Sequence, residues 1–143
     1  MKIILVDLNI ILDYLEDRNG SEKAGELFAK CFQGELKGYV CAHEITTLAY
    51  FLGKNRKKRT ETMKIISRIL QIFDIIEINK AILEKAALSN ITDFEDAVIV
   101  ESAKIKKIDY IITRNIKDFK LGQIPAMLPE EYLTRGQTER SRL

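Results

Sequence analysis

Residues 93–119 read DFEDAVIVESAKIKKIDYIITRNIKDF, and this stretch predicts a helix that leads into a buried strand with a polar end. The strand is expected at residues 110–113, directly before Arg114 and Asn115. One face of the helix carries, at the i, i+3, i+4, i+7 spacing of an amphipathic segment, Asp96, Ile99, Val100 and Ala103. Because a carboxylate is costly to bury among apolar residues without a partner, Asp96 indicates a candidate site as well as a fold.

The rest of the chain alternates between apolar segments of strand length and amphipathic segments of helix length. Further strands are expected at residues 2–6, 38–42, 73–78 and 124–128. Further helices are expected at residues 9–17, 21–32, 43–52, 60–72, 80–88 and 129–133. Strands that alternate with helices predict an α/β fold, in which right-handed crossovers build a parallel sheet flanked by helices.

The chain has the size and composition of one globular domain. Its 143 residues are predicted to form a domain at 1–135 and a polar, frayed C-terminal tail at 136–143. A hydrophobic content of 46% excludes a wholly disordered chain, and a net charge of +2 is too small to indicate nucleic-acid binding by itself. The densest basic run could hold RNA phosphates, although such runs are more often solvated links; it consists of Lys54, Arg56, Lys57, Lys58 and Arg59.

The sequence indicates a cytoplasmic protein without a membrane segment. No apolar run approaches the roughly 20 residues that cross a bilayer. The apolar start at residues 2–6 is cut by Asp7, where the core of a signal peptide would continue. One histidine and two cysteines outside a CxxC pattern cannot build an ordinary zinc site, so any metal would be a hard cation held by oxygen.

Several acids fall where parallel strands are expected to end. Asp7 follows the first strand, Glu44 lies in the first turn of the helix after the second, and Asp118 follows the strand at 110–113. Sites in open parallel sheets form beyond the carboxyl ends of the strands. Asp96 precedes its strand and reaches this edge only if its helix begins there. Taken singly, an acid in a first helical turn often only caps the helix, which could explain Glu44, Asp93 and Asp96.

If these acids lie close together in the fold, they indicate a binding site rather than separate helix caps. Two carboxylates about 4 Å apart repel by about 4 kcal/mol at an effective dielectric of 20, so four in one pocket would hold protons or bind a cation. Mg²⁺ or Mn²⁺ fits an oxygen-only set, and metal-assisted hydrolysis of a phosphodiester is the natural chemistry of such a site. The pattern alone does not choose Asp96 over Glu101, which lies on the other apolar stripe, and it does not settle the role of Asp93.

Other phosphate-binding or acid-lined folds lack support. The chain contains neither GxxxxGK[ST] nor GxGxxG. A haloacid-dehalogenase-like phosphatase would need a second aspartate two residues after Asp7, where Asn9 stands. A receiver-like signalling domain would need a lysine in the region of residues 113–115.

The order and spacing of four short motifs resemble those of the PIN-domain family (PilT N-terminus), and within it the small prokaryotic VapC-type toxin ribonucleases. The motifs are Asp7-Leu8-Asn9 with Leu12-Asp13, then Glu44, then residues 93–97, then residues 113–115 with Asp118-Phe119. The resemblance runs from residue 2 to about residue 133. It implies a three-layer α/β/α sandwich around a central parallel sheet and a Mg²⁺- or Mn²⁺-dependent ribonuclease. It also implies a homodimer with RNA as the substrate and an antitoxin as a protein partner.

The same resemblance assigns roles to individual residues. By position, Asp7, Glu44 and Asp96 match the first three acids of the family and would hold the metal. Asn115 and Asp118 match a fourth, more variable acidic element, and many relatives carry aspartate where this chain has Asn115.

Polar residues beside these acids complete the expected site. Asn9 and Thr113 match flanking positions that would orient ligands or phosphate. Arg114, beside the site, is the candidate contact for an RNA phosphate. The alternative is a PIN-like module that binds RNA or a protein without cutting.

Overall fold

The computed structural model of the chain describes residues 1–55 and 57–141, with side chains up to residue 135. Arg56 of the basic run and residues 142–143 of the expected tail lie outside the described residues. Five parallel strands form one sheet in the order β3-β2-β1-β4-β5. Their bounds are β1 (Ile3–Val6), β2 (Lys37–Cys41), β3 (Asp74–Ile76), β4 (Tyr110–Ile112) and β5 (Ala126–Met127).

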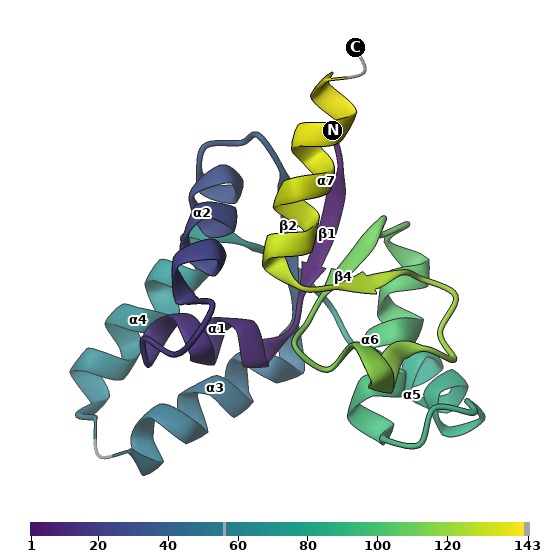
Figure 1. Ribbon diagram of the computed structural model, residues 1–143. Coiled ribbons are helices and arrows are strands. Elements are labelled where there is room, and N and C mark those ends of the chain that lie inside the picture. The colour runs from purple at the N-terminus through teal and green to yellow at the C-terminus, as the bar shows by residue number, and fades with distance from the viewer. Residues whose placement is uncertain (56, 142–143) are drawn as a thin grey trace.

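Helices cover both faces of this sheet and make a three-layer α/β/α sandwich, as predicted (Figure 1). One layer contains α1 (Leu8–Leu15), α2 (Ser21–Phe32), α3 (Ala42–Lys54), α4 (Arg59–Ile72) and α7 (Pro129–Ser141). The other layer contains α5 (Lys80–Ala87), α6 (Phe94–Ile105) and the 3₁₀ helix η1 (Ile116–Phe119). No helix within residues 1–55 and 57–141 is long and apolar enough to cross a bilayer.

Alternate residues of the central strands supply two separate cores. Ile4 and Val6 of β1 pack with α1, α2 and α4, whereas Leu5 between them packs with α5 and α6. In β4, Ile112 packs in the same core as Ile4 and Val6, and Ile111 packs in the same core as Leu5. These five side chains are fully buried, which explains why the strands read as continuous apolar runs rather than alternating ones.

Two segments differ from the sequence-based expectation. Residues 116–119 form η1 where a loop was expected, because the N–H of Asp118 donates to the carbonyl of Asn115 at 3.0 Å. Helix α7 continues to Ser141 instead of ending at residue 133. Its later residues include glutamine, glutamate and arginine, which have good helix propensity, so a polar sequence can prolong the helix.

The strand order places a crevice beside β1. From β1 the chain moves outward through β2 to β3, returns, and then continues through β4 to β5 on the other side. In sheets of this kind the ligand site lies at the carboxyl edge where the order reverses, here between the ends of β1 and β4. Asp7 and Thr113 are the residues that directly follow these two strands.

Gly38 is the position where β2 approaches its neighbours most closely. A Cβ atom there would lie 2.7 Å from Cys31 Sγ and 2.9 Å from Phe73 Cδ1. We expect Gly38→Ala to lower the free energy of unfolding by about 1–3 kcal/mol, measured by urea denaturation, because the core becomes overpacked. Gly53→Ala in α3 is the matched control, since no atom lies within 4 Å of its added Cβ. There the gain in helix propensity is expected to raise stability by about 0.5–1 kcal/mol, and equal losses in both variants would contradict this account.

Candidate active site

Asp7 links the ends of the two central strands. It directly follows β1 and is 6% exposed, yet its side chain does not cap α1. Instead, Asp7 Oδ2 accepts hydrogen bonds from Thr113 Oγ1 at 2.8 Å and from Asn9 Nδ2 at 3.1 Å. Thr113 is fully buried and directly follows β4. The predicted convergence of Asp7, Asn9 and Thr113 is therefore a direct contact.

Asn9 and Thr113 also fasten the loop after β4 to α1. Asn9 Oδ1 accepts from the N–H of Arg114 at 3.2 Å, and Thr113 Oγ1 accepts from the N–H of Asn115 at 3.0 Å. The backbone of residues 114 and 115 is thus fixed against the site, while both side chains are exposed at its rim.

Glu44 reaches the same place from α3. It is fully buried, and its Oε2 accepts from the N–H of Leu8, the first residue of α1, at 2.9 Å. The other oxygen, Oε1, is buried without a hydrogen-bond donor among the described residues. Burial raises the pKa of Glu44 well above its usual range, and the negative charge of Asp7 raises it further. Capping of α1 accounts for Oε2 of Glu44, and a side-chain hydrogen bond with Asp7, which also raises the pKa of Glu44, shows that the two carboxyl groups lie in contact.

Asp96 lies in the first turn of α6, and its neighbour Asp93 has the capping role. Asp93 Oδ1 accepts from the N–H of Asp96 at 3.0 Å, which resolves the role that the sequence left open. Burial raises the pKa of Asp96 to about 7, with further contributions from the charges of Asp93, Asp7, Asp118 and Glu95. Because the interaction between two charges weakens with distance, the effect of Asp7 and Asp118 on Asp96 indicates that the three carboxylates lie in the same region.

The acids raise one another's pKa values, but among the described residues they do not form a complete set of metal ligands. Within the part of the chain that the structure describes, no three acidic, histidine or cysteine side chains lie close enough to hold one ion. Asp118 is on η1 and exposed, and Asp96 is half-exposed.

The donor atoms present nevertheless fit a hard divalent cation. The buried Glu44 Oε1 has no donor, and the mutual charges of Asp7, Asp96 and Asp118 would be relieved by a positive ion. A hydroxyl and an amide flank these carboxylates, and both cysteines are buried free thiols. The residues that could hold the ion are Asp7, Glu44, Asp96 and Asp118.

Asp13 belongs to the rim of the site, although the sequence interpretation gave it no role. It is 6% exposed on α1, and its Oδ1 accepts from Arg114 Nη1 and, at 3.2 Å, from Arg18 Nη1. This pairing holds the Arg114 guanidinium beside the crevice. The available signal was the i, i+4 spacing of Asn9 and Asp13, which places both on one face of α1.

Two further polar residues near the site, Glu95 and His43, were not identified from the sequence. Partial burial and the charge of Asp7 raise the pKa of Glu95, which adjoins Asp96. In His43, to which the sequence interpretation gave no role, both ring nitrogens are buried without a hydrogen-bond partner among the described residues. Burial lowers the pKa of His43. Glu101, which the sequence pattern did not separate from Asp96, pairs with Lys104 at 3.0 Å.

Fold and site together define an α/β/α protein in which acidic side chains lie at the carboxyl edge of a five-stranded parallel sheet, at its switch point. The family model described as "PIN domain" matches residues 3–117. The chain belongs to the PIN-domain family, as its motifs suggested.

Solved structures of low sequence identity share this fold. A chain in the structure of VapBC2 from Rickettsia felis bound to a DNA fragment from their promoter aligns with a TM-score of 0.66 and 18% identity, over 88% of this chain and 98% of that chain. A chain in a toxin-antitoxin complex from Klebsiella pneumoniae aligns with a TM-score of 0.63 and 23% identity, over 88% and 97%. A chain of FitAcB from Neisseria gonorrhoeae aligns with a TM-score of 0.64 and 19% identity, over 89% and 98%. No curated protein is significantly similar in sequence.

Proposed function

We propose that this chain is a Mg²⁺- or Mn²⁺-dependent ribonuclease that hydrolyses phosphodiester bonds in RNA. The observation that carries the proposal is the fully buried Glu44, which lies against a second buried carboxyl, Asp7, while neither forms an ion pair with a cationic side chain among the described residues. A protein retains such an arrangement at a cost in stability, which a bound cation would offset.

The proposed roles follow the positions of the side chains. Asp7, Glu44 and Asp96 hold the cation, and Asp118 with Asn115 forms the fourth element. Thr113 and Asn9 hold Asp7 Oδ2, so Oδ1 is the oxygen that we assign to the ion. When bound, the ion would polarise the phosphate and lower the pKa of an attacking water.

Arg114 is the proposed contact for a substrate phosphate. Its backbone is fixed by Asn9, and its guanidinium is held by Asp13 while about half of its side chain stays exposed (48%). Because Asp13 already holds the guanidinium in place, Arg114 loses little side-chain conformational entropy when it binds a phosphate oxygen.

The test is cleavage of single-stranded RNA in Mg²⁺, Mn²⁺ or EDTA by the wild type and by Asp96→Asn. We expect metal-dependent cleavage that falls at least about 100-fold in Asp96→Asn, since loss of a ligand should cost no less than loss of a supporting residue. Glu101→Gln is the matched control, because it neutralises an acid on the same helix that pairs with Lys104 instead. Equal cleavage by Asp96→Asn would remove that residue from the site. No cleavage in any metal would favour the non-catalytic binding module.

We further propose that the ribonuclease is a cytoplasmic homodimer and the toxin of a toxin-antitoxin pair. The support is the set of toxin-antitoxin complexes among proteins of the same fold. The expected observations are a neighbouring antitoxin gene, growth arrest on overexpression that the antitoxin relieves, and a dimer mass by light scattering. A lone gene that is harmless on overexpression would contradict the toxin assignment.

A further inference from the structure

The turn between α3 and α4 carries a cluster of unpaired positive charge. We call this region the α3–α4 tip and define it by Tyr50, Phe51, Lys54, Lys57, Lys58, Arg59 and Lys64. Its five cationic side chains are exposed, and none forms an ion pair or a side-chain hydrogen bond within the described residues. Glu61 is the single acid in residues 54–64. The excess positive charge is therefore available to an anionic partner.

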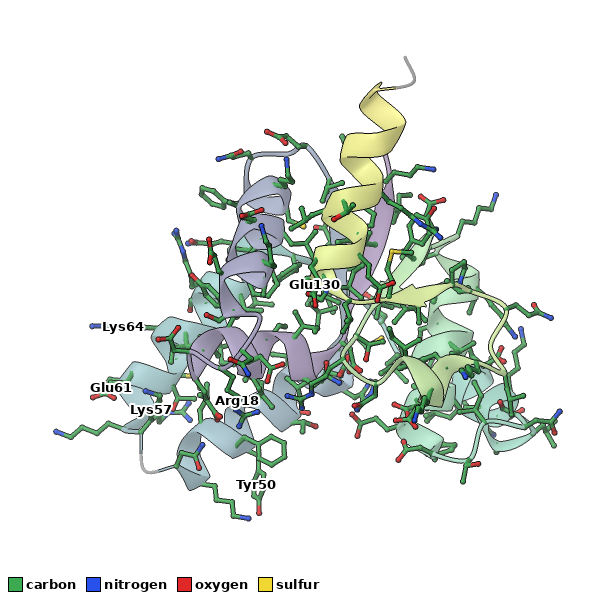
Figure 2. The ribbon with its side chains drawn as sticks, viewed as in Figure 1. Arg18, Tyr50, Lys57, Glu61, Lys64 and Glu130 are labelled. Atoms are coloured by element: carbon green, nitrogen blue, oxygen red, sulfur yellow. The ribbon has the colours of Figure 1, made fainter. Side chains whose placement is uncertain are left out.

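Two aromatic side chains lie at the end of α3, about one turn before Lys54. Tyr50 is 66% exposed and Phe51 is 38% exposed, and their ring centroids are 5.9 Å apart at an interplanar angle of 61°. Figure 2 shows Tyr50 projecting from α3 into solvent, and Lys64 projecting from α4. Lys54 follows Tyr50 by four residues and Phe51 by three, so all three share one side of the helix end. Exposed rings flanked by cations match the bases and phosphates of a single nucleic-acid strand.

Helix α3 connects this tip to the candidate active site. Glu44 lies in its first turn, and Thr47, Phe51 and Lys54 follow along one broad face at i+3, i+7 and i+10. At 1.5 Å per residue, the ten residues from Glu44 to Lys54 span about 15 Å. Helix α3 runs from the end of β2 to the tip (Figure 1), so a strand of RNA several nucleotides long that is bound at the candidate active site would be long enough to reach the tip.

We propose that the α3–α4 tip is a docking surface for single-stranded RNA beyond the position of cleavage. Its rings would stack on unpaired bases while its lysines and Arg59 contact phosphates. Single strands fit better than duplexes because only unstacked bases can reach the rings. An acidic protein segment would satisfy the charges but would not use the rings. The inference deepens the proposed ribonuclease function and rests on it for the substrate class.

The first experiment measures RNA binding in EDTA, separately from cleavage. Fluorescence anisotropy with oligouridylates of about 20 and about 4 nucleotides would compare the wild type with Lys54→Gln/Lys57→Gln/Lys58→Gln. The matched control is Lys80→Gln/Lys85→Gln/Lys107→Gln, which removes three exposed cations from the opposite helix layer. We expect the tip variant to raise the Kd of the longer RNA about tenfold, and that of the shorter RNA much less. For the tip variant, the slope of the logarithm of the binding constant against the logarithm of the salt concentration should decrease in magnitude by about 2, at about 0.7 per lost phosphate contact. For the control variant, the Kd and this slope should change little.

The second experiment separates stacking from charge. Tyr50→Leu keeps an apolar side chain but loses the ring, and should raise the Kd of the longer RNA about five- to tenfold at high salt. Tyr50→Phe retains the ring and should bind like the wild type. Poly-glutamate competitor should displace the RNA far less well than unlabelled oligouridylate.

Each outcome decides between the hypotheses. Equal losses in the tip and control variants, equal binding by Tyr50→Leu and the wild type, or efficient displacement by poly-glutamate would overturn the docking inference, the last in favour of an acidic protein partner. A wild type that cleaves RNA while the tip variant binds it undiminished would overturn the inference and leave the ribonuclease function standing. A wild type that binds RNA through the tip but never cleaves it would overturn the ribonuclease function and leave the docking inference standing.

Discussion

Asp7→Asn is expected to lower the rate of metal-dependent RNA cleavage by about 10²–10³-fold or more without unfolding the protein. Asparagine can keep the hydrogen bonds that Asp7 Oδ2 accepts from Thr113 and Asn9, because its amide oxygen accepts in the same way. The change therefore removes one negative charge and one cation ligand while the packing is retained. Loss of catalysis with a retained fold is the signature of a functional carboxylate.

The stability of the same variant provides an independent measurement. The charge of Asp7 raises the pKa of Glu44, Glu95 and Asp96, so the folded protein holds these acids against mutual repulsion. Removing that charge should leave the free energy of unfolding in EDTA equal or higher, measured by urea denaturation. Glu101→Gln, outside the site, should change neither cleavage nor stability by much. A strongly destabilised Asp7→Asn would mean that Asp7 serves the fold, and undiminished cleavage would remove it from the reaction.

The positions of Asp7 and Glu44 could be predicted because they depend on topology, whereas Thr113 was expected as the last residue of its strand and lies directly after it. Once the apolar runs define parallel strands, the residue after each central strand must lie at one edge of the sheet. The placement of Asp96 was harder, since Glu101 fits the other apolar stripe of the same helix equally well. Asp96 differs from Glu101 because α6 begins at Asp93, whose side chain caps the helix. Asp96 therefore lies in the first turn of α6, where the charge of Asp7 acts on it.

Other features depend on contacts between residues far apart in the chain. Asp13 could not be linked to Arg114 from sequence, since 101 residues separate these partners of the ion pair. Nor could periodicity show that one oxygen of Glu44 would find the N–H of Leu8 and the other would find no donor.

Glu44→Gln is expected to remove most of the stabilisation that Mn²⁺ gives the protein and to flatten the dependence of its stability on pH. For the wild type, Mn²⁺ at about 100 times its Kd should raise the free energy of unfolding by about 2.7 kcal/mol, because the ion binds the folded state. In Glu44→Gln an amide replaces the buried carboxylate, and its oxygen can still accept from Leu8. The fold should persist, while the ion loses a charged ligand.

The sign of the pH effect follows from the raised pKa values of Glu44 and Asp96. A carboxyl that binds its proton more tightly in the folded state contributes nothing when both states are protonated, and destabilises the fold as the unfolded state loses its proton first. For Asp96, whose pKa rises from 3.8 to about 7, stability should fall between about pH 4 and 7. Glu44 should begin to contribute near the usual glutamate pKa of 4.5, and its raised pKa should extend the fall in stability to higher pH.

Thermal unfolding in EDTA from about pH 5 to pH 8 would therefore show a declining Tm for the wild type and a shallower decline for Glu44→Gln. Mn²⁺ should restore the wild-type Tm most at the alkaline end, where the carboxylates are ionised. Glu101→Gln should retain both the decline and the response to Mn²⁺. If Glu44→Gln responded to Mn²⁺ as the wild type does, Glu44 would be a structural acid that caps α1, and the metal would have to be held by Asp7, Asp96 and Asp118 without it.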